Sequence, residues 1–349
     1  MSERVRVAVV GAGDFGRHHA RVYAALEGAQ LAGVYDTDRR RAEEVAREFG
    51  TEALESLEAV ADRAQAASVA VPTAEHVRVG AWLLGRGLDV LVEKPMAATV
   101  AEGKQLMEAA AGARRILQVG HVERFNPAIV AAAREVKEPL FFEVHRLGVF
   151  TPRSLDVDVV YDVMIHDLDV LLSLAGPVRE VKAVGIPVVT DKVDIAHARL
   201  EFATGAVANV TASRISTERV RKLRFFQRHE YISVDYARRD ALRIRVAQPA
   251  AAREAYGPDP AVPGGWAGAS PGPQFAFEKL AVETEEPLRA ELRAFLASVR
   301  ARSTPLVDGA AGLNALALAS RVMEGIREHA RAVPRSAPDS AAPRSQAAT

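Results

Sequence analysis

A short apolar run followed by a glycine-rich turn constrains the fold of this chain more than any other feature. The β-branched residues in the stretch 5–10 predict a buried strand, and a helical pattern follows the turn. The turn carries Gly11-x-Gly13-x-x-Gly16, in which Gly11 permits the tight bend, Gly13 admits a pyrophosphate and Gly16 allows close packing of helix on strand. The N-terminus of that helix would favour phosphate, so we interpret the unit as a dinucleotide site that also includes Asp14 and Phe15.

A carboxylate stands where the adenosine ribose of such a dinucleotide is expected. Asp36 ends a second apolar run, 20 residues beyond Gly16. A carboxylate there accepts hydrogen bonds from a free 2′-hydroxyl and repels a 2′-phosphate, which predicts NAD rather than NADP. Arg39 and Arg40 follow closely and would suit a phosphate, but we interpret them as solvated residues of the next helix.

The first part of the chain alternates between strand and helix patterns. Predicted strands are residues 5–10, 30–35, 67–71, 88–92 and 115–120, with helices at 15–26, 38–49, 74–86 and 99–111. This alternation predicts an α/β fold with a Rossmann-type, doubly wound parallel sheet. Ligands of such sheets bind beyond the carboxyl ends of the strands. The residues to examine are therefore 11–16, 36, 72–73, 93–95 and 121–124.

From about residue 140 the pattern changes to longer strands that alternate apolar and polar residues. This pattern predicts an α+β domain with a large, mostly antiparallel open sheet, followed by helices near 286–301 and 309–330. The Pro- and Gly-rich stretch 248–273 is expected to be a surface excursion. The domain boundaries predicted are 1–123, 124–332 and a disordered, low-complexity tail over 333–349.

The composition excludes several classes of function. The chain has no cysteine, so disulfides, thiolate catalysis and Cys-bound metals are excluded. Lys and Arg together number 45, as do Asp and Glu, and this balance argues against a nucleic-acid-binding surface. The basic stretch 219–229 is interpreted as a strand with one solvated face rather than as a nucleic-acid site; the alternative is that it faces an anionic substrate. Neither a secretory signal nor an apolar run of membrane length is visible, so we expect a cytoplasmic protein.

Lys94 ends a predicted strand at the ligand edge, where the nicotinamide ring is expected. A lysine there can donate a hydrogen bond to a substrate hydroxyl and lower the pKa of that hydroxyl. The competing interpretation is a surface lysine after a strand. A cis Lys94–Pro95 peptide would fix the direction of the lysine, which the sequence cannot show.

The predicted helix 159–176 carries a second chemical cluster. Asp162 and His166 are four residues apart and Asp169 follows three later, so all three are expected near one helix face. Imidazole is the natural proton acceptor for alcohol oxidation, and a carboxylate on its second nitrogen would stabilise the imidazolium. A zinc site and a structural histidine are the alternatives, and we predict no metal. Arg124 and Asn126, after the last strand of the first domain, are either substrate ligands or an interdomain hinge.

Together these motifs resemble the glucose–fructose oxidoreductase/inositol dehydrogenase/rhizopine-catabolism (Gfo/Idh/MocA) family over roughly residues 4–330. The resemblance rests on GAGDFG, VPTAEH, Glu93-Lys94-Pro95 and the spacing of Asp162, His166 and Asp169. It implies that Lys94 and His166 form the catalytic pair with Asp162, and that the second sheet builds homodimers or homotetramers. It also places Pro72, Thr73, His76 and Glu93 beside the cofactor. Met164 replaces a glycine that is usual in the family.

A narrower resemblance extends to the bacterial and archaeal UDP-N-acetylglucosamine 3-dehydrogenases, through VGHVERFNPA, DVDVVYDVMIHDLDVLLSL and EYISVDY. It implies NAD-dependent oxidation of the sugar C3 hydroxyl, with a pyridoxal-phosphate aminotransferase as partner and a place in lipid A biosynthesis. A UDP-sugar would account for extra arginines near the cleft, namely Arg124, Arg153 or Arg214. The alternatives are a dehydrogenase of inositol, a free sugar or UDP-N-acetylglucosaminuronate, and a non-catalytic NAD-responsive regulator.

Overall fold

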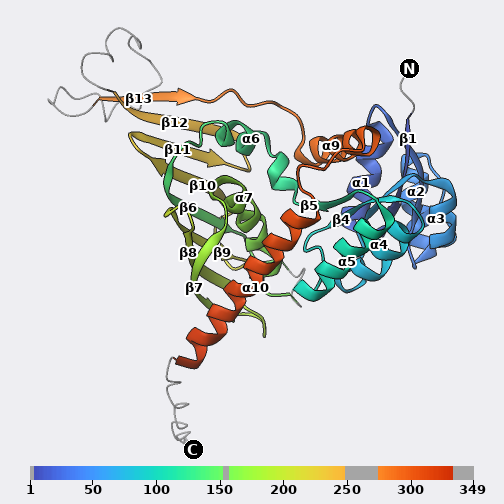
Figure 1. The fold of residues 1–349 in the computed structure, drawn as a ribbon, viewed down its shortest axis with the longest axis horizontal. Helices are drawn as coiled ribbons and strands as arrows, with labels where there is room; N and C mark the ends of the chain where they lie inside the picture. Colours follow the sequence, from blue (N-terminus) through green and yellow to red (C-terminus); the bar gives the residue numbers. More distant parts are fainter. Residues whose placement is uncertain (1–3, 152–156, 248–273, 333–349) are drawn as a thin grey trace, which may run out of the picture.

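The computed structural model describes residues 4–151, 157–247 and 274–332, which form two sheets joined by their covering helices (Figure 1). The first sheet is fully parallel, with the strand order β2-β1-β3-β4-β5. Its strands are β1 (Val5–Val10), β2 (Ala29–Tyr35), β3 (Ala66–Val69), β4 (Asp89–Glu93) and β5 (Leu117–Gly120). Its helices are α1 (Asp14–Ala25), α2 (Arg39–Phe49), α3 (Leu57–Arg63), α4 (His76–Gly85) and α5 (Val100–Ala113). The doubly wound prediction is confirmed.

Local sequence explains where these elements begin. Asp38 and Ser56 cap α2 and α3 through their side chains, and Thr99 forms a capping box with Glu102 at α5. The strands consist largely of buried Val, Leu and Ala, as expected for a parallel sheet covered on both faces. Two short 3₁₀ turns, η1 (Thr73–Glu75) and η2 (Val122–Phe125), follow the carboxyl ends of β3 and β5.

The second sheet has eight strands in the order β13-β12-β11-β10-β6-β9-β8-β7, and only the β6–β9 pair is parallel. The strands are β6 (Pro139–Leu147), β7 (Val178–Ile186), β8 (Ile195–Phe202), β9 (Val207–Ser213), β10 (Val220–Gln227), β11 (Glu230–Asp235), β12 (Asp240–Ala247) and β13 (Gln274–Lys279). Its helical elements are α6 (Pro127–Ala133), the π-helix η3 (Val160–Met164) and α7 (Ile165–Ala175). The predicted antiparallel open sheet is confirmed. The sequence pattern did not predict β13, α3 or α6.

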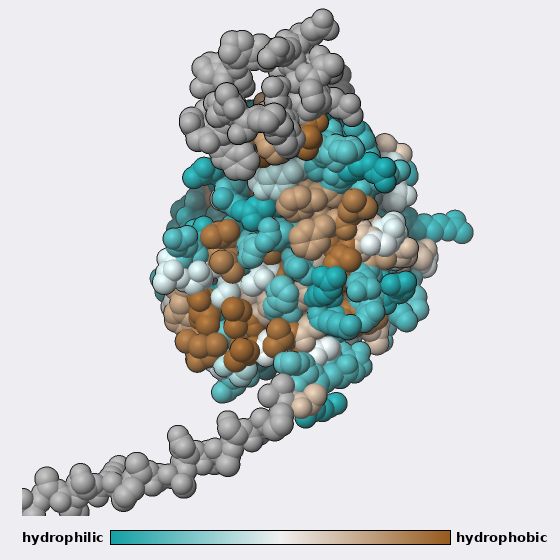
Figure 2. All heavy atoms as spheres, turned by 90° about the vertical axis from the view of Figure 1, so that its left-hand side faces the viewer, coloured by the Kyte–Doolittle hydropathy of each residue, from teal (hydrophilic) through white to brown (hydrophobic). Residues whose placement is uncertain are grey.

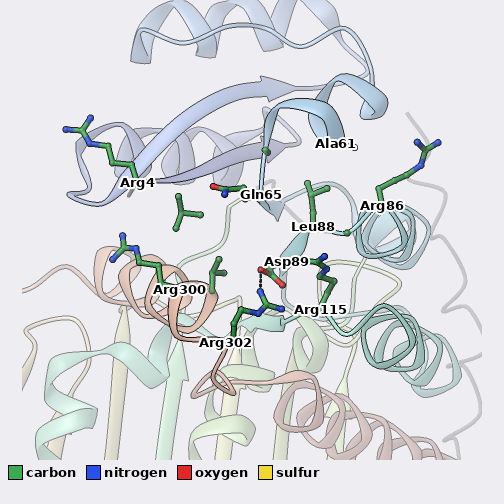
Figure 3. A pocket seen from close by; sticks show the side chains of 13 residues that line it. Arg4, Ala61, Gln65, Arg86, Leu88, Asp89, Arg115, Arg300 and Arg302 are labelled. Atoms are coloured by element: carbon green, nitrogen blue, oxygen red, sulfur yellow. Dashed lines mark hydrogen bonds and ion pairs between the residues drawn. The ribbon is translucent and has the colours of Figure 1, made fainter. Parts of the chain in front are cut away.

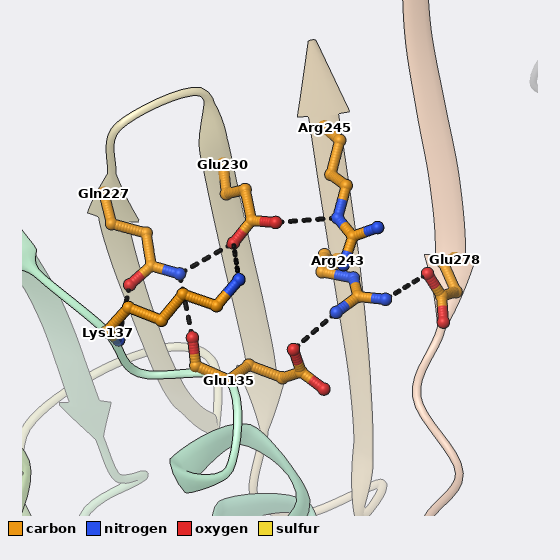
Figure 4. A network of polar contacts seen from close by, with 7 residues as sticks. All are labelled: Glu135, Lys137, Gln227, Glu230, Arg243, Arg245 and Glu278. Carbon is orange, nitrogen blue, oxygen red and sulfur yellow. Dashed lines mark hydrogen bonds and ion pairs between the residues drawn. The ribbon is translucent and has the colours of Figure 1, made fainter. Parts of the chain in front are cut away.

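A network of ion pairs ties α6 to the outer strands of this sheet (Figure 4). Arg243 on β12 contacts both Glu135, just after α6, and Glu278 on β13. Glu230 on β11 accepts from Arg245 at 2.7 Å and from Gln227 at 2.7 Å. These contacts hold the outermost strands in register with the centre of the sheet.

The two C-terminal helices, α9 (Pro287–Ala301) and α10 (Gly309–Ala332), connect both halves. Helix α9 packs on α1, and its Leu292 and Phe295 belong to the same buried cluster as Val5 and Tyr23. Helix α10 runs between the sheets and contacts α5, β5, α7 and β7 (Figure 1). Residues 287–301 therefore complete the first core, although the predicted boundary assigned them to the second domain.

No helix among the described residues is long and apolar enough to cross a membrane. The predicted excursion 248–273 and the predicted disordered tail 333–349 lie outside the described residues.

Candidate active site

The glycine turn after β1 has the geometry that a dinucleotide requires. Gly11 has φ +98°, and a Cβ atom there would lie 2.4 Å from the carbonyl oxygen of Ala70. A Cβ on Gly16 would lie 1.7 Å from the carbonyl oxygen of Gly11, whereas a Cβ on Gly13 would meet nothing within 4 Å. The turn is thus closed on its protein side and open in front of α1, which leaves room for a pyrophosphate.

Asp36 lies against this turn as predicted. Its Oδ2 atom accepts a 2.6 Å hydrogen bond from the backbone N–H of Ala12, and its Oδ1 atom accepts one of 2.8 Å from Asp38. These two contacts fix the carboxylate and leave further lone pairs for ribose hydroxyls. Arg39 and Arg40 pair instead with Glu43 and Glu44 on their own helix, which agrees with their interpretation as solvated helix residues.

A cavity of about 230 Å³ lies beyond the carboxyl ends of the first sheet and brings together seven of the predicted site residues. It is lined by Phe15, Ala70, Val71, Pro72, Thr73, His76, Glu93, Lys94, Pro95, Val157, Tyr161 and Asp162. The α7 side of the second domain thus meets the ligand edge of the first at Lys94 and Asp162. A larger cavity of about 490 Å³ opens at the opposite edge, where the strands begin; Figure 3 shows Arg4, Arg86 and Arg300 extending away from its centre.

Lys94 is 9% exposed in its side chain and spans the two domains. Its Nζ atom donates to the backbone oxygen of Asp162 at 2.6 Å and lies 3.4 Å from Oδ1 of the same residue. The Lys94–Pro95 peptide is cis. The contacts with Asp162 hold the ammonium group at the cavity, where a substrate oxygen would meet it.

Glu93, the residue before Lys94, is held in place by a hydrogen bond from His19. Glu93 accepts a 2.9 Å hydrogen bond from Nε2 of the fully buried His19. Burial alone would raise the pKa of Glu93, but the hydrogen bond and charge of His19 outweigh it, and the pKa is lowered. His76 lies 2.9 Å from the carbonyl oxygens of both Pro95 and Val71, so it fixes the two turns that line the cavity.

His166 stands in the first turn of α7, next to the cluster around Lys94. Burial, followed by the positive charge of Lys94, holds its pKa well below 6.5, and Arg146, His121 and Arg221 lower it further. The ring of His121 lies edge-on to that of His166, with 6.5 Å between centroids. His166 is therefore a neutral imidazole at neutral pH, the state required of a proton acceptor.

The prediction that a carboxylate binds the second ring nitrogen of His166 is wrong. The Nδ1 atom of His166 is buried without a hydrogen-bond partner among the described residues. Asp162 belongs to the π-helix η3, whose wider turn directs it to Lys94, while Asp169 pairs with Arg124 at 3.4 Å. The three side chains therefore have separate partners, and no group of metal-ligating side chains forms in the described part of the chain.

The other residues predicted to bind substrate differ in their contacts. Asn126 is 3% exposed, caps α6 and donates to Glu123 and to the backbone oxygen of Tyr236, so its predicted substrate contact does not fit its position. Arg214 contacts the carbonyl oxygen of Val157 and lies 3.8 Å from a carboxylate oxygen of Asp194. Arg153 lies outside the described residues.

A buried charge network beside His166 was missed by the sequence reasoning. Arg146 on β6 donates to both carboxylate oxygens of Asp167, at 2.6 and 2.9 Å, and to Glu123 at 2.8 Å. Asp167 is adjacent to His166, so the network anchors the start of α7 to the sheet. The alternation of polar residues on β6 was the only available signal, and it does not identify a partner.

Two family models match this chain. The model "Oxidoreductase family, NAD-binding Rossmann fold" matches residues 5–121, and the GFO/IDH/MocA C-terminal domain matches residues 141–229. These matches confirm both the family resemblance and the prediction of NAD.

Similar proteins have the same organisation. The chain is 37% identical to UDP-N-acetylglucosamine 3-dehydrogenase of Acidithiobacillus ferrooxidans over 321 residues, which cover 91% of this chain and 96% of that protein. It is 30% identical to scyllo-inositol 2-dehydrogenase (NAD(+)) of Bacillus subtilis, over 62% of this chain and 69% of that protein.

Two solved structures superpose on nearly the whole of this chain. That of the Acidithiobacillus ferrooxidans enzyme superposes with a TM-score of 0.82 at 34% identity, over 93% of this chain and 98% of that chain. Levoglucosan dehydrogenase in complex with NADH superposes with a TM-score of 0.79 at 19% identity, over 93% of this chain and 98% of that chain, and supports the fold. The chain therefore belongs to the Gfo/Idh/MocA oxidoreductase family, with an NAD-binding Rossmann domain at its N-terminal end.

Proposed function

We propose that this chain oxidises the C3 hydroxyl of UDP-N-acetylglucosamine to the 3-keto sugar, with NAD as the hydride acceptor. The observation that carries the reaction is the placement of His166 within charge interaction of Lys94, with burial and then that charge holding the pKa of the imidazole well below 6.5. The choice of substrate rests on the similarity to the Acidithiobacillus ferrooxidans enzyme, which extends over nearly the whole of both proteins.

Each residue of the site has one task in this proposal. Lys94 donates a hydrogen bond to the substrate oxygen and favours its deprotonation. Nε2 of His166 takes the hydroxyl proton, because Nδ1 is buried. Asp162 positions Lys94 through its backbone oxygen. When bound, NAD supplies the acceptor for the hydride that leaves C3.

The residues at the carboxyl edge of the first sheet would hold the cofactor. Gly13 leaves the space for the pyrophosphate, Gly11 and Gly16 allow the turn to pack closely behind it, and Asp14 and Phe15 lie beside it at the start of α1. Asp36 would receive the ribose hydroxyls. The residues that line the cavity near the nicotinamide position are Pro72, Thr73, His76, Glu93 and Lys94.

The direct test is NADH formation at 340 nm with purified protein, NAD and UDP-N-acetylglucosamine. An amine donor and a pyridoxal-phosphate aminotransferase should be added to remove the keto product. We propose an aminotransferase of this kind as the functional partner of this enzyme. Turnover with the UDP-sugar and none with free N-acetylglucosamine or inositol supports the proposal. Turnover with a free polyol alone would favour an inositol-type dehydrogenase, and NAD binding without any turnover would favour a regulator.

The open face of the second sheet supports a homo-oligomer. Cross-strand partners place Phe141, Phe226, Tyr231, Ile244 and Phe277 in one row across five strands. The rings of Phe141 and Phe226 are 5.8 Å apart, and those of Phe226 and Tyr231 are 4.7 Å apart. Figure 2 shows apolar side chains gathered on this side of the molecule. We propose that a second copy covers this row, which sedimentation equilibrium of the wild type and of Phe226→Asp would test.

A further inference from the structure

Arg221 projects from the sheet toward the helix that carries His166. Its cross-strand partner on β6 is Arg146, and directly paired residues point to the same face of a sheet. The guanidinium of Arg146 contacts Asp167 on α7, so this face is the one covered by α7. Leu223 and Phe225 follow Arg221 on the same face and are buried in the core of the second domain.

Within the described part of the chain, the guanidinium of Arg221 forms no direct ion pair. Its side chain is exposed and makes no hydrogen bond or ion pair with any residue that the structure describes. Partial burial and then the charge of Arg146 lower its pKa, and Arg219 adds to this, while the more distant carboxylates of Glu123 and Asp167 offset only part of the effect. By contrast, Arg146 is fully occupied by Asp167 and Glu123.

Arg221 is also close enough to the proposed proton acceptor for their charges to interact, because its charge contributes to the low pKa of His166. The other arginines considered for the substrate are already engaged, Arg124 with Asp169 and Arg214 with the backbone of Val157. Among the described residues, Arg221 is thus a guanidinium without an ion-pair partner on the face that α7 covers, near the second cation Arg219 and within charge interaction of His166.

We propose that Arg221 binds the diphosphate of the nucleotide-sugar substrate. This inference rests on the proposed function. The diphosphate is attached to C1, two ring carbons from the C3 hydroxyl, so a sugar oxidised at His166 brings its phosphates within about one ring's width of that residue. A guanidinium matches two phosphate oxygens at once, and this contact is stronger than a neutral hydrogen bond.

The test compares Arg221→Gln and Arg221→Lys with the matched variant Arg224→Gln. Arg224 lies on the same strand but on the opposite face, where it pairs with Glu143 at 3.0 Å. Binding of UDP is measured by titration calorimetry in the presence of NAD, and KM and kcat are measured with UDP-N-acetylglucosamine. Thermal unfolding confirms that each variant is folded.

Arg221→Gln should weaken UDP binding and raise the KM for the UDP-sugar by about 10- to 100-fold, with kcat and the KM for NAD nearly unchanged. Arg221→Lys should retain part of the affinity, and Arg224→Gln all of it. A KM and UDP affinity unchanged by Arg221→Gln, or a loss confined to kcat, would overturn the assignment.

The two proposals fail separately. If the wild type oxidises the UDP-sugar but Arg221→Gln behaves like the wild type, the subsite is wrong and the function stands. If the wild type binds UDP through Arg221 without oxidising the sugar, the subsite stands and the function is wrong. If the wild type neither binds UDP nor oxidises the UDP-sugar, both are wrong.

Discussion

The neutral state of His166 makes the stability of the fold sensitive to mild acid. In the folded protein, burial and then the charges of Lys94, Arg146, His121 and Arg221 hold the pKa of His166 well below 6.5. In the unfolded chain the pKa returns to about 6.5. Below pH 6.5 the unfolded state therefore binds one proton more than the folded state, and this residue destabilises the fold as the pH falls. The free-energy penalty is negligible at pH 7.5 and reaches at most about 1.4 kcal/mol at pH 5.5, the limit in which the folded imidazole takes up no proton.

Replacing His166 by Asn removes this pH-dependent contribution, whereas the loss of the ring contact with His121 affects stability equally at both pH values. The difference in the free energy of unfolding between wild type and His166→Asn, measured by urea unfolding, should shift in favour of the variant by up to about 1.4 kcal/mol between pH 7.5 and pH 5.5. Burial also lowers the pKa values of His76 and His121, but these groups titrate in both proteins and cancel. If the difference in unfolding free energy between the two proteins stays constant within about 0.3 kcal/mol from pH 7.5 to pH 5.5, the inference that the folded protein keeps His166 neutral is refuted.

The same variant tests the proposed proton transfer. Loss of a general base typically lowers kcat by about 10²- to 10⁴-fold. We expect NAD binding to be retained, because His166 lies outside the glycine turn and the Asp36 contacts. Equal loss of turnover and of NAD affinity would indicate structural damage and contradict the assignment.

Three further predictions concern the cofactor and the buried charges. Asp36→Ala should raise the KM for NAD by about 10-fold or more. It should also reduce the preference for NAD over NADP, measured as the ratio of kcat/KM with NAD to kcat/KM with NADP. Arg146→Met should lower the free energy of unfolding by about 3–5 kcal/mol in urea, because the buried Asp167 loses both of its hydrogen bonds. Burial and the charge of Glu93 hold the pKa of Glu291 well above 4.5, so keeping it protonated costs stability as the pH rises above 4.5. Glu291→Gln should therefore gain stability relative to the wild type as the pH rises from 4.5 to 7.5, as measured by urea unfolding at both pH values.

Much of the first sheet was predictable because its signals are local. The buried runs and the glycine turn mark the strands, and the fold rule for parallel sheets indicates which strand ends meet the ligand. Lys94 and Asp36 were found in this way. The packing of α9 against α1 was not predictable, since Phe295 joins a cluster with residues nearly the whole chain away.

The charged partners within the site were less predictable than the residues themselves. The spacing of Asp162, His166 and Asp169 predicts one face of a regular α-helix, but the π-helix η3 changes the direction of Asp162. Met164, where the family usually has glycine, is the last residue of that π-helix. The basic stretch that contains Arg221 left two interpretations open, a solvated face or a face toward an anionic substrate, because only the register of β10 against β6 shows which face Arg221 occupies.

The charges around His166 also connect substrate binding with proton transfer. A diphosphate bound at Arg221 would offset part of the positive charge that, with Lys94, Arg146 and His121, keeps the pKa of His166 low. The imidazole would then be a stronger base in the substrate complex than in the free enzyme. The profile of kcat against pH reports the complex and that of kcat/KM reports the free enzyme, so the acidic pKa should be higher in the kcat profile. Arg221→Gln should raise the acidic pKa in the kcat/KM profile, because a positive charge near His166 is lost. The difference between the acidic pKa values of the two profiles should therefore become smaller. An equal difference in the variant and the wild type would show that His166 does not respond to charge at Arg221.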